Sequence, residues 1–197
     1  ALEGSIFIAG AAVQWLRDSL KIIKNAKETE NLYSKNDPSQ NVYLVPAFVG
    51  LGAPYWDGEA RGALFGLTRN TGVPELVKAT LDSVVYQTKD LISAMEKDSG
   101  IKIKKIKVDG GMVNNNQFVQ FLSNLLLCVC LRPKINETTS LGAAYLAGYQ
   151  SGLIKKFTDI NQKWKSEKKF VHKMNKRDIE KLYLGWQKAI KGALIVK

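Results

Sequence analysis

Apolar residues of this chain recur with helical spacing in some segments and with extended spacing in others, and this alternation constrains the fold most strongly. After Pro74, residues Val77, Leu81 and Val84 recur at helical spacing, and Gly100 provides a stop signal. The elements expected in this way are a helix over residues 6–23, a strand over 42–48, a helix over 74–99, a strand over 105–108, a helix over 114–126, a strand over 128–131 and a helix over 138–148. Helices that alternate with strands predict an α/β layered fold with βαβ crossovers.

Two stretches between these elements do not show such periodicity. Residues 24–40 are polar and contain a turn-forming run at 36–39. Residues 49–71 combine glycines with aromatic residues, so we expect an ordered loop that packs on the body of the protein. Gly10 lies inside the first expected helix, where glycine is unfavourable, and this indicates close approach of a ligand or of another backbone.

The net charge of +11 is distributed unevenly along the chain. Residues 155–197 carry +9 of it, and residues 1–154 are nearly neutral. This division predicts a domain over 1–154 and a basic extension over 155–197, which ends in an amphipathic helix that docks on the same domain. Lysines outnumber arginines by 24 to 5, whereas nucleic-acid readers favour arginine, so we expect a solvated lysine face and no nucleic-acid partner.

Several other classes of protein are disfavoured. No apolar run approaches the ~20 residues that span a bilayer, so we expect a soluble, cytoplasmic protein with no membrane span. Cys128 and Cys130 are one residue apart, which suits neither a disulfide framework nor a zinc site, and we expect both in the core of a protein from a reducing compartment. His172 has no cluster of metal ligands beside it, so we expect no metal site.

The strand-to-glycine turn over residues 108–116 is the most suggestive place for ligand chemistry. Such turns bring the backbone close to phosphates and nucleosides, although this one lacks the spacing of either common phosphate-binding motif. A turn without a ligand therefore remains an alternative at this point, and the three asparagines at 114–116 can be helix caps or can bind a base or ribose. Among the carboxylates, Asp57, Glu59, Asp82 and Asp109 have suggestive surroundings, but no pair has a spacing that requires a two-carboxylate site.

Two longer motifs resemble a known family. Residues 62–67 (GALFGL), followed after seven residues by 75–82 (ELVKATLD), resemble the second signature of the FGGY carbohydrate kinases. Within that family, residues 1–18, 45–62 and 140–148 resemble the members that phosphorylate glycerol.

The resemblance implies a two-domain kinase of the actin, Hsp70 and sugar-kinase type, with a ribonuclease H-like core and with ATP and substrate in the cleft between the domains. This chain resembles most of the C-terminal domain. It begins at Ala1 without an initiator Met, and we expect it to be a piece of a larger protein. The catalytic aspartate, the glycerol-binding residues, the phosphate-holding turns and the Mg²⁺ ligands are all expected upstream of Ala1. No catalytic residue is therefore assigned.

The resemblance also implies which residues contact ATP. Gly10 and Gln14 fall where the family's first helix in this segment meets the nucleotide, Gly111 where a glycine turn packs on adenosine, and Asn115 where a side chain binds near the base. The implied reaction transfers the γ-phosphoryl group of MgATP to glycerol, with the protein's own N-terminal domain as partner and a homo-oligomer possible. By itself the chain is expected to be inactive. The alternatives are a kinase of the same family for a pentulose or another sugar, or a non-catalytic interaction module.

Overall fold

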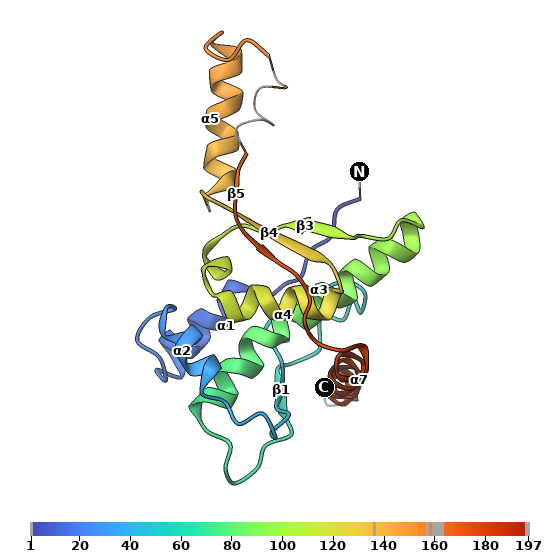
Figure 1. Ribbon diagram of the computed structural model, residues 1–197. Coiled ribbons are helices and arrows are strands. Elements are labelled where there is room, and N and C mark those ends of the chain that lie inside the picture. The colour runs from blue at the N-terminus through green and yellow to red at the C-terminus, as the bar shows by residue number, and fades with distance from the viewer. Residues whose placement is uncertain (1, 136, 157, 159–163, 196–197) are drawn as a thin grey trace.

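The longest element is helix α3 (Val73–Ser99), which crosses the centre of the molecule beside helix α4 (Asn116–Leu126) (Figure 1). The computed structural model describes residues 2–135, 137–156, 158 and 164–195. Gly100 ends α3 with φ +68°, a left-handed conformation that glycine adopts at little cost. The helices expected over 74–99 and 114–126 are thus confirmed, with a short 3₁₀ turn at the start of the second one.

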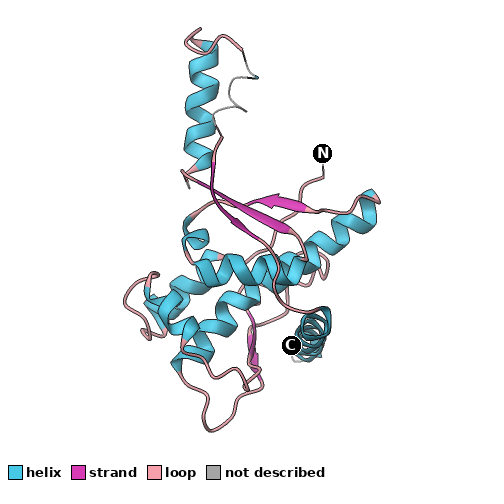
Figure 2. Cartoon of the chain, viewed as in Figure 1, coloured by secondary structure: helices cyan, strands magenta, loops and turns pink. Residues whose placement is uncertain are grey.

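A three-stranded sheet lies against α4. Strands β3 (Lys105–Lys107), β4 (Val129–Pro133) and β5 (Ser166–Phe170) follow the order β3-β4-β5, with β3 parallel and β5 antiparallel to β4. Cys130 pairs with Ile106 on one side and with Phe170 on the other. Cys130 and Phe170 are buried on the face that α4 covers, so this sheet forms a layer that packs on the helices and lies above them in Figure 2.

A second, two-stranded sheet holds the C-terminal helix. Strands β1 (Tyr43–Val45) and β2 (Ala63–Phe65) are antiparallel, and helix α7 (Lys176–Ile195) packs against both. Trp186 of α7 is fully buried, and its ring stacks on that of Tyr86 with centroids 5.2 Å apart. The amphipathic helix expected in the basic extension is therefore present and docked.

Four local expectations need correction. Residues 6–9 and 20–23 of the helix expected over 6–23 are not helical: α1 (Gly10–Gln14) begins at Gly10 and continues into a π-helical turn, η1 (Trp15–Ser19), which ends at Ser19. Helix α2 (Glu28–Ser34) lies in the stretch read as merely polar, and strand β2 lies in the stretch read as loop. Strand β5 lies in the basic extension, where the sequence indicated no strand. Each of these segments is short, and tertiary contacts rather than local periodicity decide its conformation.

Helix α5 (Thr138–Gln150) stands apart from the rest of the chain (Figure 1). None of its residues is buried, and its side chains Leu146 and Tyr149 are 57% and 46% exposed. The helix expected over 138–148 is present, but no other described segment covers it. Among the described residues, no helix is both long and apolar enough to cross a membrane.

Candidate functional site

A cavity of about 660 Å³ opens between α1, α2 and the turn that follows β3. The four residues that the sequence indicated, Gly10, Gln14, Gly111 and Asn115, all line it. Two of them lie on α1 and two lie about a hundred residues later, so the fold brings them together from distant parts of the chain. The volume is in the range of small-molecule and cofactor sites.

The cavity has an apolar floor and a polar rim. Val13 and Leu81 are buried below it, and Met112 is half-buried at its side. Gln14 and Lys27 are exposed at the rim. A flat apolar ring with polar edges, such as a nucleobase, suits a surface of this kind.

The turn that forms one wall depends on glycine. Gly110 has φ +87° and ψ 176°, a conformation that residues with a Cβ rarely adopt. It precedes the 3₁₀ turn η2 (Gly111–Asn114), after which Asn115 starts α4 as its N-cap. Gly111 and Asn115, at the two ends of this short turn, both line the cavity.

Asn115 is held by two side-chain hydrogen bonds. Its Oδ1 accepts from the backbone N–H of Phe118 at 3.1 Å, and its Nδ2 donates to Oγ1 of Thr29 at 3.2 Å. The helix-cap interpretation of this residue is therefore confirmed. The second N–H of the same amide group is not needed for either bond, so the cap does not exclude contact with a ligand, which stays a prediction.

Gly10 and Gly111 both open onto free space. A Cβ atom added at either position would meet no other part of the chain within 4 Å. The interpretation of Gly10 as an unfavourable residue inside a helix is wrong, because Gly10 is the first residue of α1. No backbone approaches Gly10 closely, and contact of this residue with a ligand stays a prediction.

Two charged residues that line the cavity, Arg17 and Glu30, have partners within the chain. Arg17 forms an ion pair with Asp18 at 2.6 Å, and their hydrogen bond raises the pKa of the guanidinium. Glu30 accepts two hydrogen bonds from Asn116. Across the part of the chain that the structure describes, no group of three His, Cys, Asp or Glu side chains could hold a metal ion.

The suggestive carboxylates lie elsewhere. Burial raises the pKa of Asp82, which accepts hydrogen bonds from Tyr33 and Lys78 beneath α2. The carboxylate of Asp109 accepts from the hydroxyl of Thr138. Cys128 and Cys130 are buried free thiols, as expected of core residues. None of these side chains lines the cavity.

Sequence reasoning missed the contribution of α2 to the site. Thr29 and Glu30 line the cavity and hold Asn115 and Asn116. The sequence indicates this helix only weakly, because α2 has just seven residues. Its acidic first turn is the one feature typical of a helix start. Arg17 was also missed, although it lies one turn after Gln14 on the same face of the helix.

Known proteins share both the sequence and this architecture. The family model "FGGY family of carbohydrate kinases, C-terminal domain" matches residues 1–151. Curated glycerol kinases from Geobacillus sp. (strain WCH70) and Halalkalibacterium halodurans are 54% and 53% identical over all 197 residues, and the chain spans 40% of the length of each. A crystal structure of Plasmodium falciparum glycerol kinase with ADP matches 97% of this chain and 38% of its own, with a TM-score of 0.86 and 33% identity.

More distant sugar kinases share the fold alone. A ligand-bound xylulose kinase from Lactobacillus acidophilus matches 98% of this chain and 40% of its own, with a TM-score of 0.80 and 24% identity. The expected fold class, the C-terminal half of an actin/Hsp70/sugar-kinase-like enzyme, is thereby confirmed. The chain belongs to the FGGY family of carbohydrate kinases, and it represents the family's C-terminal domain.

Proposed function

We propose that this chain is the ATP-side domain of a glycerol kinase. The reaction would transfer the γ-phosphoryl group of ATP to a hydroxyl of glycerol, giving glycerol 3-phosphate and ADP. The observation that carries the proposal is the meeting of Gly10, Gln14, Gly111 and Asn115 in one cavity of nucleotide size. The 54% identity to a curated glycerol kinase supports the choice of acceptor, since the xylulose kinase neighbour is 24% identical.

The chain's own residues would bind and orient the nucleoside. The base would lie on the apolar floor of Val13 and Leu81, and the glycines at 10 and 111 would let the two walls approach it closely. Gln14 and Asn115 would supply polar contacts at its edges. Such positioning, together with electrostatic stabilisation, accounts for most of the rate in phosphoryl transfer. The catalytic base, the phosphate donors and the Mg²⁺ ligands would come from another domain.

The surface around α5 would receive that other domain. Helix α5 has no buried residue, and strand β3 forms one edge of the three-stranded sheet. Exposed apolar side chains, such as Leu146 on α5 and Leu153 in the turn that follows it, are typical of a surface that packs against further structure. The curated relatives are about two and a half times as long as this chain, which leaves ample sequence for such a domain.

Two assays test the proposal. The full-length protein should form glycerol 3-phosphate and ADP from glycerol and ATP, and the purified 197-residue chain should not, because half a cleft cannot orient both reactants. Turnover of glycerol by the 197-residue chain would contradict the proposal.

A substrate screen on the full-length protein separates the alternatives. Preference for a pentulose over glycerol would favour another sugar kinase of the family. Failure to phosphorylate any polyol or sugar would favour a non-catalytic module that meets acidic partners through its lysines. The sequence's expectations of no nucleic-acid partner and of a homo-oligomer remain predictions.

A further inference from the structure

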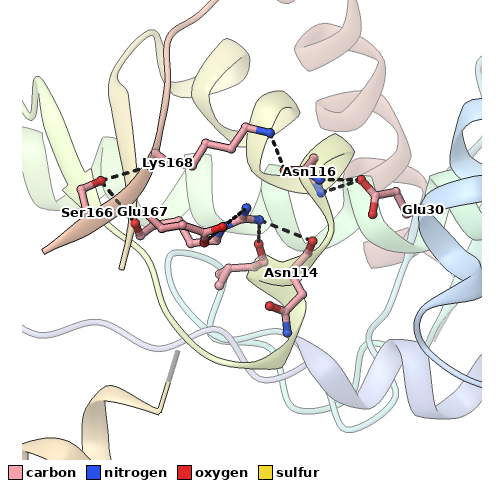
Figure 3. A network of polar contacts seen from close by, with 8 residues as sticks. Glu30, Asn114, Asn116, Ser166, Glu167 and Lys168 are labelled. Carbon is pink, nitrogen blue, oxygen red and sulfur yellow. Dashed lines mark hydrogen bonds and ion pairs between the residues drawn. The ribbon is translucent and has the colours of Figure 1, made fainter. Parts of the chain in front are cut away.

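A polar network outside the cavity holds the turn that forms its wall (Figure 3). At its centre is Arg132 of β4, which is 7% exposed. Its Nη1 donates to the carbonyl oxygen of Val113 at 2.8 Å and to that of Asn114 at 3.4 Å. On its other side it forms an ion pair with Glu167 of β5 at 3.0 Å. A buried guanidinium requires such a partner, so Glu167 holds Arg132 in the orientation that reaches the turn.

The other end of the turn is held from two sides. Glu30 of α2 accepts from the backbone N–H of Asn116 at 3.1 Å and from its Nδ2 at 2.9 Å. Lys168 of β5 donates to Oδ1 of the same asparagine at 2.8 Å, so the amide lies between an anion and a cation (Figure 3). The ammonium group of Lys168 also lies 5.0 Å from the ring centroid of Phe170. Both oxygen and nitrogen of the Asn116 side chain are thereby fixed.

These contacts connect the basic C-terminal extension to the cavity. Glu167 and Lys168 lie in β5, more than fifty residues after the turn, and neither lines the cavity. We propose that Glu167 and Lys168 are positioning residues for the nucleotide: acting through Arg132 and Asn116, they hold residues 110–116 in the conformation that the nucleoside requires. This inference rests on the proposed function, since it assumes an adenine nucleotide in the cavity.

The proposal predicts a selective effect on nucleotide binding. A turn that is not held in place must be ordered by the ligand, and the cost of that ordering weakens affinity. The acceptor of the phosphoryl group would bind to the other domain, so its KM and the kcat at saturating ATP should stay unchanged.

The test compares two neighbouring lysines in the full-length protein. Lys168→Met removes the hydrogen bond to Asn116, and Lys169→Met is the matched control, because the Lys169 side chain lies on the opposite face of the same strand. Lys168→Arg should retain the donor and rescue binding, and Glu167→Gln removes the charge that holds Arg132. Two quantities are measured: the dissociation constant of ADP by calorimetry, and amide hydrogen exchange over residues 110–118 without nucleotide.

We expect Lys168→Met and Glu167→Gln to weaken ADP binding by about threefold to tenfold, as for the loss of one ordinary hydrogen bond. Exchange over 110–118 should become faster in these variants while the remaining peptides stay as in the wild type. Lys169→Met and Lys168→Arg should behave as the wild type.

Each of the following results would overturn the inference. Equal affinity of Lys168→Met and Lys169→Met for ADP would do so even if exchange changed. Faster exchange throughout the protein would assign the two residues a merely structural role. Failure of the unmodified full-length protein to bind ADP would refute the proposed function, and the inference with it; normal ADP binding with unaffected variants would refute the inference alone.

Discussion

The removal of one hydroxyl group, in Tyr183→Phe, tests how α7 is held on the rest of the chain. Asp90 of α3 is 5% exposed and accepts hydrogen bonds from Tyr183 at 2.5 Å, from Tyr55 at 2.8 Å and from Nε1 of Trp186 at 2.7 Å. These donors come from a loop and from α7, so one carboxylate joins three segments. Burial raises the pKa of Asp90, and the three donors oppose this increase by stabilising the anion.

The sign of the pH dependence follows from this pKa. A group whose pKa is raised by folding favours the native state at low pH, and this contribution is lost as the pH rises through the folded-state pKa. Loss of the Tyr183 donor raises the pKa of Asp90 further, so the variant should lose more stability at pH 7.5 than at pH 4. A hydrogen bond to a charged acceptor contributes about 1.5–3 kcal/mol, and one to a neutral acceptor about 1 kcal/mol. The difference between the two pH values should therefore be about 1 kcal/mol.

Urea unfolding followed by tryptophan fluorescence measures these free energies. Tyr43→Phe is the matched control, because the Tyr43 hydroxyl also donates to α7, but to the neutral carbonyl oxygen of Leu182 at 3.2 Å. Its loss should cost about 1 kcal/mol at both pH values. If Tyr183→Phe and Tyr43→Phe show the same loss at pH 7.5 and pH 4, Asp90 is not the anionic acceptor described here.

Three other substitutions test local parts of the structure. A hydrogen bond from the backbone N–H of Asp37 is the main cause of the lowered pKa of Glu75. Glu75→Gln should therefore lower the free energy of unfolding by about 1–2 kcal/mol at pH 7. This loss should shrink as the pH falls below 4.5, the ordinary pKa of a glutamate, and unfolding measured at both pH values checks it. Gly110→Ala should cost about 1–3 kcal/mol because its φ of +87° is strained for alanine, and an unchanged melting temperature would refute this conformation. Asn115→Ala should cost about 1–2 kcal/mol through loss of the cap on Phe118, whereas Asn115→Asp should retain the cap; circular dichroism melts of the pair check this.

Much of the architecture was predictable because long amphipathic segments carry their own signal. Helix α3 extends over 27 residues, with proline near its start and glycine at its end, and α7 extends over 20 residues with one apolar face. In both helices the spacing of the apolar residues predicts the element that the structure shows, and in α3 the start and stop residues agree with it. The sequence could not show β5, because four of its five residues are exposed and Phe170 alone points into the core. This strand exists because β4 offers it a pairing edge, which is a tertiary effect.

The site was predictable in a different way. The glycine turn suggested a nucleoside site, but composition and spacing left a turn without a ligand as an alternative. The choice of Gly10, Gln14, Gly111 and Asn115 came from resemblance to a family, and the structure brings all four to one cavity. Residues that support the turn from outside, such as Arg132, could not be found in the sequence, because their role depends on hydrogen bonds to backbone carbonyl groups.

The central claim is that this cavity binds the adenosine part of ATP, and a crystal structure of the full-length protein with ADP tests it most directly. The base should lie on Val13 and Leu81, with the backbone at Gly10 and Gly111 in contact with the nucleoside and with Asn115 near the base. The cap between Asn115 and Phe118 should be unchanged, because ligand contact requires no rearrangement of α4. ADP bound elsewhere, with this cavity filled by water or by side chains, would contradict the account.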